Sequence, residues 1–102
     1  MDVKNIVQSI QEIAIELEKL DYSLEWYLFG SYLLNQHLAK DIDLLIIYKS
    51  LDSAQIVRNK LSDLSMQAPL HLIFMHKDEE EELDFIKSQN VIELFSYNYN
   101  QT

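Results

Sequence analysis

The fold is decided by residues 26–48, which read WYLFGSYLLNQHLAKDIDLLIIY. Around the start of this stretch, apolar residues from Leu24 to Leu28 alternate with a mixed set, which is typical of a strand with two different faces. That strand ends at Gly30, the single glycine of the chain. The stretch then resumes with Asp41-Ile42-Asp43 and continues as an apolar run to Tyr48. Such a run predicts a central strand buried on both faces, with its acidic start at a solvent-exposed rim.

The segments around this stretch predict three helices and a further strand. Apolar residues recur at helical spacing over residues 3–20 and again from Asp52 to Leu64, and a third helix is expected to begin at Asp78. The acidic residues 78–82 are expected to form a solvated first turn, because carboxylates complement the helix dipole. The apolar run Leu70–Met75 predicts a third strand. Residues 91–97 fit either a last short strand or a helix.

The short connection between Gly30 and Asp41 constrains the topology. Ten residues separate them, so if both serve one site, the first two strands run antiparallel. The third strand follows a helical crossover, which favours a parallel pairing with the second strand and places His71 beside Asp43. We therefore expect an α/β (α+β) fold, a mixed sheet of three to four strands flanked by helices, as a single domain over residues 1–102.

Composition narrows the function classes. The chain has 102 residues, no cysteine, and 17 acidic against 8 basic residues, for a net charge of −9. Such a surface repels a phosphate backbone, so general binding of nucleic acid is disfavoured. The absence of cysteine excludes disulfides and thiolate metal sites. The apolar runs are too short to span a bilayer, and the first residues lack the core of a signal peptide, so we expect a cytoplasmic protein.

The residue types at the two ends of the connection between Gly30 and Asp41 suggest a site that binds a metal ion and a phosphate. Side chains two apart in a strand point to the same side, so Asp41 and Asp43 present two carboxylates about 6 to 7 Å apart at the backbone. A divalent cation, Mg²⁺ or Mn²⁺, would relieve their repulsion. Gly30 allows the backbone close to a ligand, and Ser31 offers a hydroxyl and N–H groups to a phosphate. The alternative is that Gly30 only ends a strand and the two aspartates form a solvated strand entrance.

The sequence from Phe29-Gly30-Ser31 to Asp41-Ile42-Asp43-Leu44-Leu45 resembles the nucleotidyltransferase superfamily related to DNA polymerase beta, and most of all its minimal nucleotidyltransferases. The resemblance implies transfer of a nucleotidyl group from a nucleoside triphosphate. It also implies that Asp41 and Asp43 bind Mg²⁺ or Mn²⁺ and are catalytic, and that Gly30 and Ser31 bind the triphosphate.

One departure from the family pattern leaves two functions open. The resemblance implies a third carboxylate near the start of the third strand, where this chain has His71, and Glu93 is a possible substitute. The first function is a metal-dependent nucleotidyltransferase. The second is a catalytically degenerate interaction module, such as the antitoxin that minimal nucleotidyltransferases provide against a small helical HEPN toxin. Because the fold uses nearly the whole chain, we expect a second copy or a HEPN-type protein to complete the substrate pocket.

Overall fold

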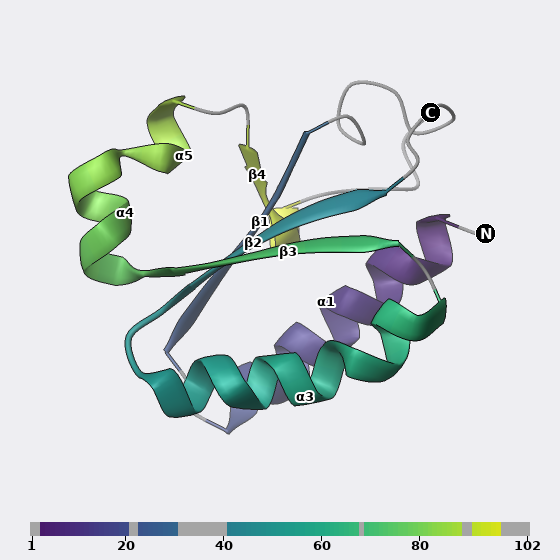
Figure 1. The fold of residues 1–102 in the computed structure, drawn as a ribbon. Coiled ribbons are helices and arrows are strands. Elements are labelled where there is room, and N and C mark those ends of the chain that lie inside the picture. Colours follow the sequence, from purple (N-terminus) through teal and green to yellow (C-terminus); the bar gives the residue numbers. More distant parts are fainter. Residues whose placement is uncertain (1–2, 21–22, 31–40, 68, 89–90, 97–102) are drawn as a thin grey trace.

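The computed structural model describes residues 3–20, 23–30, 41–67, 69–88 and 91–96. Figure 1 shows the helices and strands in these ranges, which follow one another along the chain as α1 (Val3–Lys19), β1 (Leu24–Phe29), β2 (Ile42–Tyr48), α3 (Leu51–Gln67), β3 (Leu70–His76), α4 (Lys77–Leu83), α5 (Phe85–Ser88), β4 (Val91–Glu93) and the 3-10 helix η1 (Leu94–Ser96). None of these helices is long and apolar enough to cross a lipid bilayer.

The four strands form one mixed sheet in the order β3-β2-β1-β4. β1 runs antiparallel to β2 and to β4, whereas β2 and β3 are parallel. The predicted α/β mixed sheet of three to four strands is therefore confirmed, and so are the two strand directions inferred from the connection lengths. Of residues 91–97, which fit a strand or a helix, residues 91–93 form β4 and residues 94–96 form η1, and Tyr97 lies outside the described residues.

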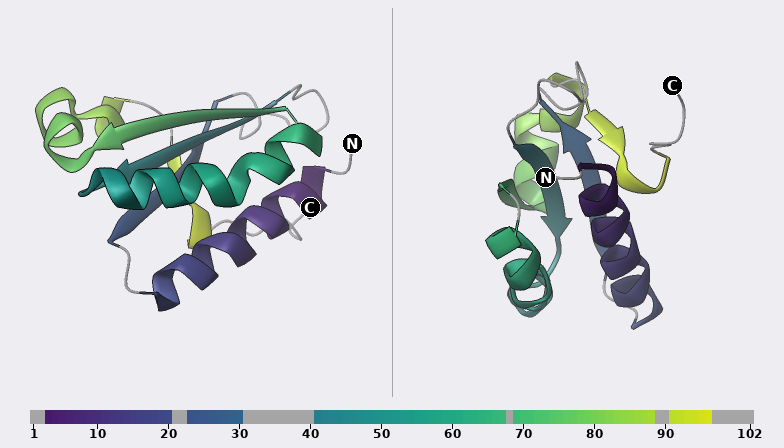
Figure 2. Two further views of the ribbon diagram at one scale, coloured as in Figure 1. Left: turned by 60° about the horizontal axis from the view of Figure 1, so that its bottom comes forward. Right: turned by 90° about the vertical axis from the view of Figure 1, so that its right-hand side faces the viewer.

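Two clusters of apolar side chains cover the two faces of the sheet. Helices α1 and α3 lie against one face, as the views in Figure 2 show. The core between them and the sheet is formed by Val7, Ile10, Ala14, Leu17, Trp26, Leu28, Ile42, Leu44, Ile46, Val57, Leu61, Leu64 and Leu94. The other face carries a smaller cluster around Leu45, Ile47 and Met75, against which Phe85 and Ile86 of α5 pack. This second face is only partly covered, and it is the face that carries the acidic start of β2.

The start of α4 corrects one expectation about the acidic run. His76 caps the helix: its Nδ1 accepts a hydrogen bond from the Asp78 backbone N at 3.1 Å, and the Glu79 carboxylate accepts one from the His76 backbone N at 3.2 Å. Glu80, however, is buried, and its Oε2 accepts a hydrogen bond from the backbone N of Ile86 at 3.1 Å. The prediction of a solvated first turn is therefore wrong at Glu80, because this buried carboxylate satisfies one backbone donor of α5, the N–H of Ile86.

A small polar network on the second face joins β1 to α4. Glu25 accepts hydrogen bonds from the Tyr27 hydroxyl at 2.8 Å and from Lys77 Nζ at 2.9 Å. Burial raises the pKa of Glu25, but the hydrogen bonds from Lys77 and Tyr27 lower it by more, so its pKa lies below the ordinary value. Burial and the bond to Glu25 raise the pKa of Tyr27, which keeps its hydroxyl protonated as a donor.

Replacement of Glu25 by glutamine is expected to lower the free energy of unfolding by about 1 kcal/mol near pH 7, a small value because the side chain is 38% exposed. The pKa of Glu25 is lowered in the folded state. The extra stability of the wild type is therefore fully present above the ordinary carboxyl pKa, and it is lost as the pH falls through the lower pKa of the folded state. Urea unfolding at about pH 7 and about pH 3 measures this. The matched control is Glu12→Gln, an exposed carboxylate on α1. A difference that persists at the lower pH would contradict the role of the charge.

Candidate active site at the rim of the sheet

The ends of three neighbouring strands meet at one rim of the sheet. Phe29 at the end of β1 pairs with Asp43 near the start of β2, and Asp43 pairs with His71 near the start of β3. The backbone N of Ile42 also donates to the carbonyl of Pro69 at 3.0 Å, which joins the segments that lead into β2 and β3. The expectation that His71 lies beside Asp43 is therefore confirmed.

Asp43 and His71 are joined by a hydrogen bond. Nδ1 of His71 lies 2.9 Å from Oδ1 of Asp43. An ionised carboxylate can only accept, so in this contact Nδ1 carries the hydrogen and donates it. The Asp43 side chain is 14% exposed and the His71 side chain 59%. The carboxylate is therefore mostly shielded from solvent, whereas the imidazole that contacts it is exposed.

The other oxygen of the Asp43 carboxylate lies against Gly30. Gly30 has a φ of +83°, in the left-handed region, and a Cβ added there would stand 1.9 Å from Oδ2 of Asp43 and 2.9 Å from its Cγ. A side chain at position 30 is thus disfavoured twice, by the backbone conformation and by the Asp43 carboxylate, which would have to move. Gly30 was expected to admit a ligand, and in the structure the group that approaches its backbone is Asp43 itself.

The remaining candidates are placed differently. Asp41 is half-buried and lies one residue before β2, next to the rim. Ser31 lies outside the described residues. Glu93 pairs with Tyr27 on the side of β1 that faces away from β2, so the structure does not bring it to Asp43. Within the described ranges, no three His, Asp or Glu side chains are grouped so that they could hold a metal ion.

The rim also has an apolar wall that the sequence did not suggest. The ring of Phe29 meets the ring of Phe85 edge to face, with centroids 5.6 Å apart. Phe85 belongs to α5, a helix of four residues that is too short to show a periodic pattern. This contact lies next to Asp43 and packs the end of β1 against α5 on the second face of the sheet.

The donor set fits Mg²⁺ or Mn²⁺ in part. Carboxylate oxygens are the ligands that these ions prefer, and Mg²⁺ is often held by one or two carboxylates together with substrate phosphates. Asp41 and Asp43 offer such oxygens at the rim, where Oδ1 of Asp43 also accepts the hydrogen bond from His71. The residues present therefore suit an ion shared with a triphosphate better than a site closed by protein ligands alone.

The comparison with protein families identifies the family of the chain. The family of nucleotidyltransferase domains matches residues 10–98, a range that contains the whole sheet and every candidate site residue. Neither a search of curated proteins nor a search of solved structures found a match to the chain. Because the family match covers most of the 102 residues, the chain belongs to the nucleotidyltransferase domain family and has the small mixed sheet expected of a minimal nucleotidyltransferase.

Proposed function

We propose that this chain is a metal-dependent nucleotidyltransferase that transfers a nucleotidyl group from a nucleoside triphosphate to an acceptor, with a partner protein as one candidate acceptor. The observation that carries the proposal is the position of Asp43. Its carboxylate is fixed between the Gly30 backbone and His71, at a rim that the family match includes. A mostly shielded carboxylate at a strand start supports a ligand role, because its geometry is set before any ligand binds.

Each residue at the rim has a separate role in the proposed reaction. Asp41 and Asp43 would hold Mg²⁺ or Mn²⁺, and such an ion would neutralise the charge of the triphosphate and favour in-line attack. Gly30 leaves the carboxylate of Asp43 room beside the backbone, and Ser31 binds a phosphate through its hydroxyl and N–H group. An acceptor hydroxyl that has lost its proton to water then bonds to the α-phosphorus. The bond from that phosphorus to the bridging oxygen breaks, and pyrophosphate leaves.

A transfer assay tests this function. The chain is incubated with Mg²⁺ or Mn²⁺ and a nucleoside triphosphate that is labelled at either the α- or the γ-phosphate. The acceptors are the chain itself and the purified product of a neighbouring reading frame that encodes a small helical protein. Label is expected on an acceptor from the α-labelled compound only. The proposal fails if no acceptor is labelled and the triphosphate with metal does not raise the melting temperature.

A second candidate function is a catalytically degenerate binding module, such as the antitoxin of a HEPN-type toxin. The observation that favours it is His71, which occupies the rim position where the resemblance implies a carboxylate. The two functions separate in one measurement with such a toxin. A binding module forms the complex and neutralises the toxin equally well after Asp43→Asn, whereas an enzyme that neutralises by modification does not.

Replacement of His71 by aspartate is expected to tighten Mn²⁺ binding roughly tenfold, because the third position at the rim then offers an oxygen ligand. The same change is expected to cost about 1 kcal/mol of stability without metal, since it puts a carboxylate beside Asp43. Thermal melting with and without Mn²⁺ measures both effects. His71→Asn is the control, because it adds no charge. If aspartate gains no more metal-dependent stabilisation than the wild type or asparagine, position 71 takes no part in metal binding.

A further inference from the structure

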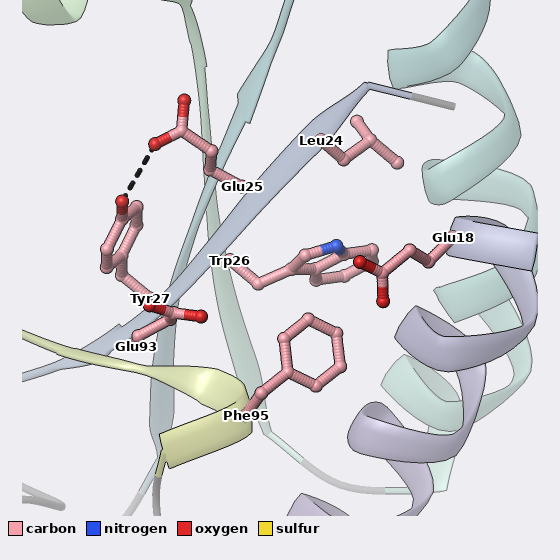
Figure 3. Close-up of a pocket in the computed structure, with 7 residues that line it drawn as sticks. All are labelled: Glu18, Leu24, Glu25, Trp26, Tyr27, Glu93 and Phe95. Atoms are coloured by element: carbon pink, nitrogen blue, oxygen red, sulfur yellow. Dashed lines mark hydrogen bonds between the residues drawn. The ribbon is translucent and has the colours of Figure 1, made fainter. Parts of the chain in front are cut away.

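The two outer edges of the sheet differ in what covers them. At one edge, β4 pairs with β1 and leads into η1, where the carbonyl of Leu94 accepts a hydrogen bond from Gln11 Nε2 at 3.0 Å and Phe95 lies beside Trp26 (Figure 3). At the other edge, β3 pairs with β2, and no second strand of the described residues lies along it. β3 therefore presents an edge seven residues long, with backbone N–H and C=O groups that can pair with a further strand.

The sequence of β3 does nothing to protect this edge. The strand reads LHLIFMH and contains no lysine, proline or carboxylate, the residues with which proteins commonly keep an exposed edge from pairing. The chain has 17 acidic residues, yet residues 64–77 contain none. In the middle of the strand, Leu72, Ile73 and Phe74 are each only half-buried. Another strand can therefore add to β3 and cover apolar surface without burying a carboxylate.

One side of α3 continues the surface beyond the strand. The guanidinium carbon of Arg58 lies 4.1 Å from the centre of the Phe74 ring, and Figure 2 shows α3 on the β3 side of the sheet and α1 on the β1 side. Leu51, Arg58, Ser62 and Met66 fall within about 80° around the helix axis. Leu51 is 75% exposed and Met66 86%. We term the edge of β3 and this side of α3 the β3–α3 surface.

We propose that the β3–α3 surface binds a second copy of the chain, with the two β3 strands antiparallel about a two-fold axis through Ile73. Full overlap of β3 with its own copy is centred on this residue. Ile73 then faces Ile73 of the second copy, and Leu72 faces Phe74. Apolar pairs of this kind stabilise neighbouring strands. An axis perpendicular to the sheet keeps α3 of both copies on the same face, as a closed two-fold interface requires.

The match of α3 with its own copy favours this occupant over a segment of another protein. Leu51 lies about 10 Å before Arg58 along the helix, and Met66 lies about 12 Å after it. Because Arg58 is level with Phe74, close to the axis, the two-fold brings Leu51 of one copy level with Met66 of the other. One symmetry operation therefore pairs the free edge and covers two strongly exposed apolar side chains. A bound peptide would satisfy the strand edge alone.

The net charge of −9 on each copy opposes this association. Salt screens repulsion between charges that are exposed to solvent, but it does not weaken apolar contacts or backbone hydrogen bonds in the same way. The dimer is therefore expected to tighten as the ionic strength rises from about 0.01 M to about 0.15 M. An interface held by ion pairs would respond in the opposite direction.

This interface goes beyond nucleotidyl transfer and does not depend on it. Neither Asp41 nor Asp43 belongs to the β3–α3 surface, and no nucleotide or metal takes part in the pairing. Because the two β3 strands are antiparallel, the rims of the two copies lie at opposite ends of the shared sheet. A dimer without transfer activity, or an active monomer, would separate the two proposals.

The first test places a thiol on the two-fold axis. The chain has no cysteine, so Ile73→Cys carries a single one. Residues directly opposite in an antiparallel pair have Cα atoms about 4.5–5.5 Å apart, which a disulfide can bridge. Mild oxidation of the full chain is expected to cross-link most of Ile73→Cys and little of Ile92→Cys, the matched control on β4, where Ile92 is 41% exposed. Equal cross-linking of the two variants would overturn the proposal.

The second test measures the dimer by sedimentation at increasing concentration of the chain. Ile73→Lys puts like charges opposite each other on the axis and is expected to raise the dimer Kd at least about tenfold. Ile92→Lys, the same change at the other edge, should leave the Kd within about twofold of wild type. Melting temperatures show whether both variants fold, and if Ile73→Lys does not, cross-linking of Ile73→Cys decides. A wild-type chain that stays monomeric, equal effects of the two lysines, or a dimer that weakens as salt is added would each contradict the interface.

Discussion

Replacement of Asp43 by asparagine is expected to lower metal-dependent nucleotidyl transfer by roughly 10²–10³-fold while the fold survives. Asparagine has almost the shape of aspartate, and its Oδ1 can still accept the hydrogen bond from Nδ1 of His71. The side chain is only 14% exposed, so a change of shape at this position would be costly, but a change of charge alone need not be. What the amide loses is the negative charge that holds a divalent cation.

The measurement combines the rate of label transfer with the melting temperature of the metal-free chain. Asp63→Asn is the matched control, because Asp63 is exposed on α3 and the substitution removes the same charge. Asp41→Asn should lose transfer as Asp43→Asn does if the two carboxylates share one ion. Transfer by Asp43→Asn within about threefold of wild type would remove Asp43 from the proposed site.

The topology of the sheet was predictable because the lengths of the connections between strands, which can be counted in the sequence, constrain the strand directions. Ten residues between Gly30 and Asp41 admit an antiparallel pair, and a helix between β2 and β3 favours a parallel one. Those two relations are enough to put His71 opposite Asp43. The fold class, the strand directions and this one contact could therefore be derived before the structure was known.

The contacts that the sequence did not reveal depend on side-chain positions across elements. Residues 78–82 are all acidic, and the sequence does not distinguish one from another. Glu80 is buried because the chain turns into α5 beside it, where its carboxylate accepts a hydrogen bond from the backbone N of Ile86. β4 ends after three residues and is followed by η1, and the length of a strand is not visible in an apolar segment as short as residues 91–97. The approach of Asp43 to Gly30 likewise needs the register of β1 and β2.

Replacement of Gly30 by alanine is expected to lower the free energy of unfolding by about 2–3 kcal/mol and to weaken metal binding. Two costs add at this position. The φ of +83° is strained for any residue with a Cβ, and the new methyl group would stand 1.9 Å from Oδ2 of Asp43. The carboxylate must rotate away from the methyl group, which moves Oδ1 from its contact with His71. Urea unfolding measures the first effect, and Mn²⁺-dependent melting measures the second.

A double-mutant cycle separates the two costs. In an Asp43→Ala background the carboxylate is absent, and the nearest remaining atom of that side chain is Cβ, at 3.2 Å from the position of the added methyl group. Gly30→Ala is then expected to cost only the backbone strain, about 1–2 kcal/mol. The difference between the two backgrounds is the steric cost of placing the methyl group against the Asp43 carboxylate. If Gly30→Ala costs the same in both, position 30 requires glycine only for its backbone conformation, and the Asp43 carboxylate is not positioned by the end of β1.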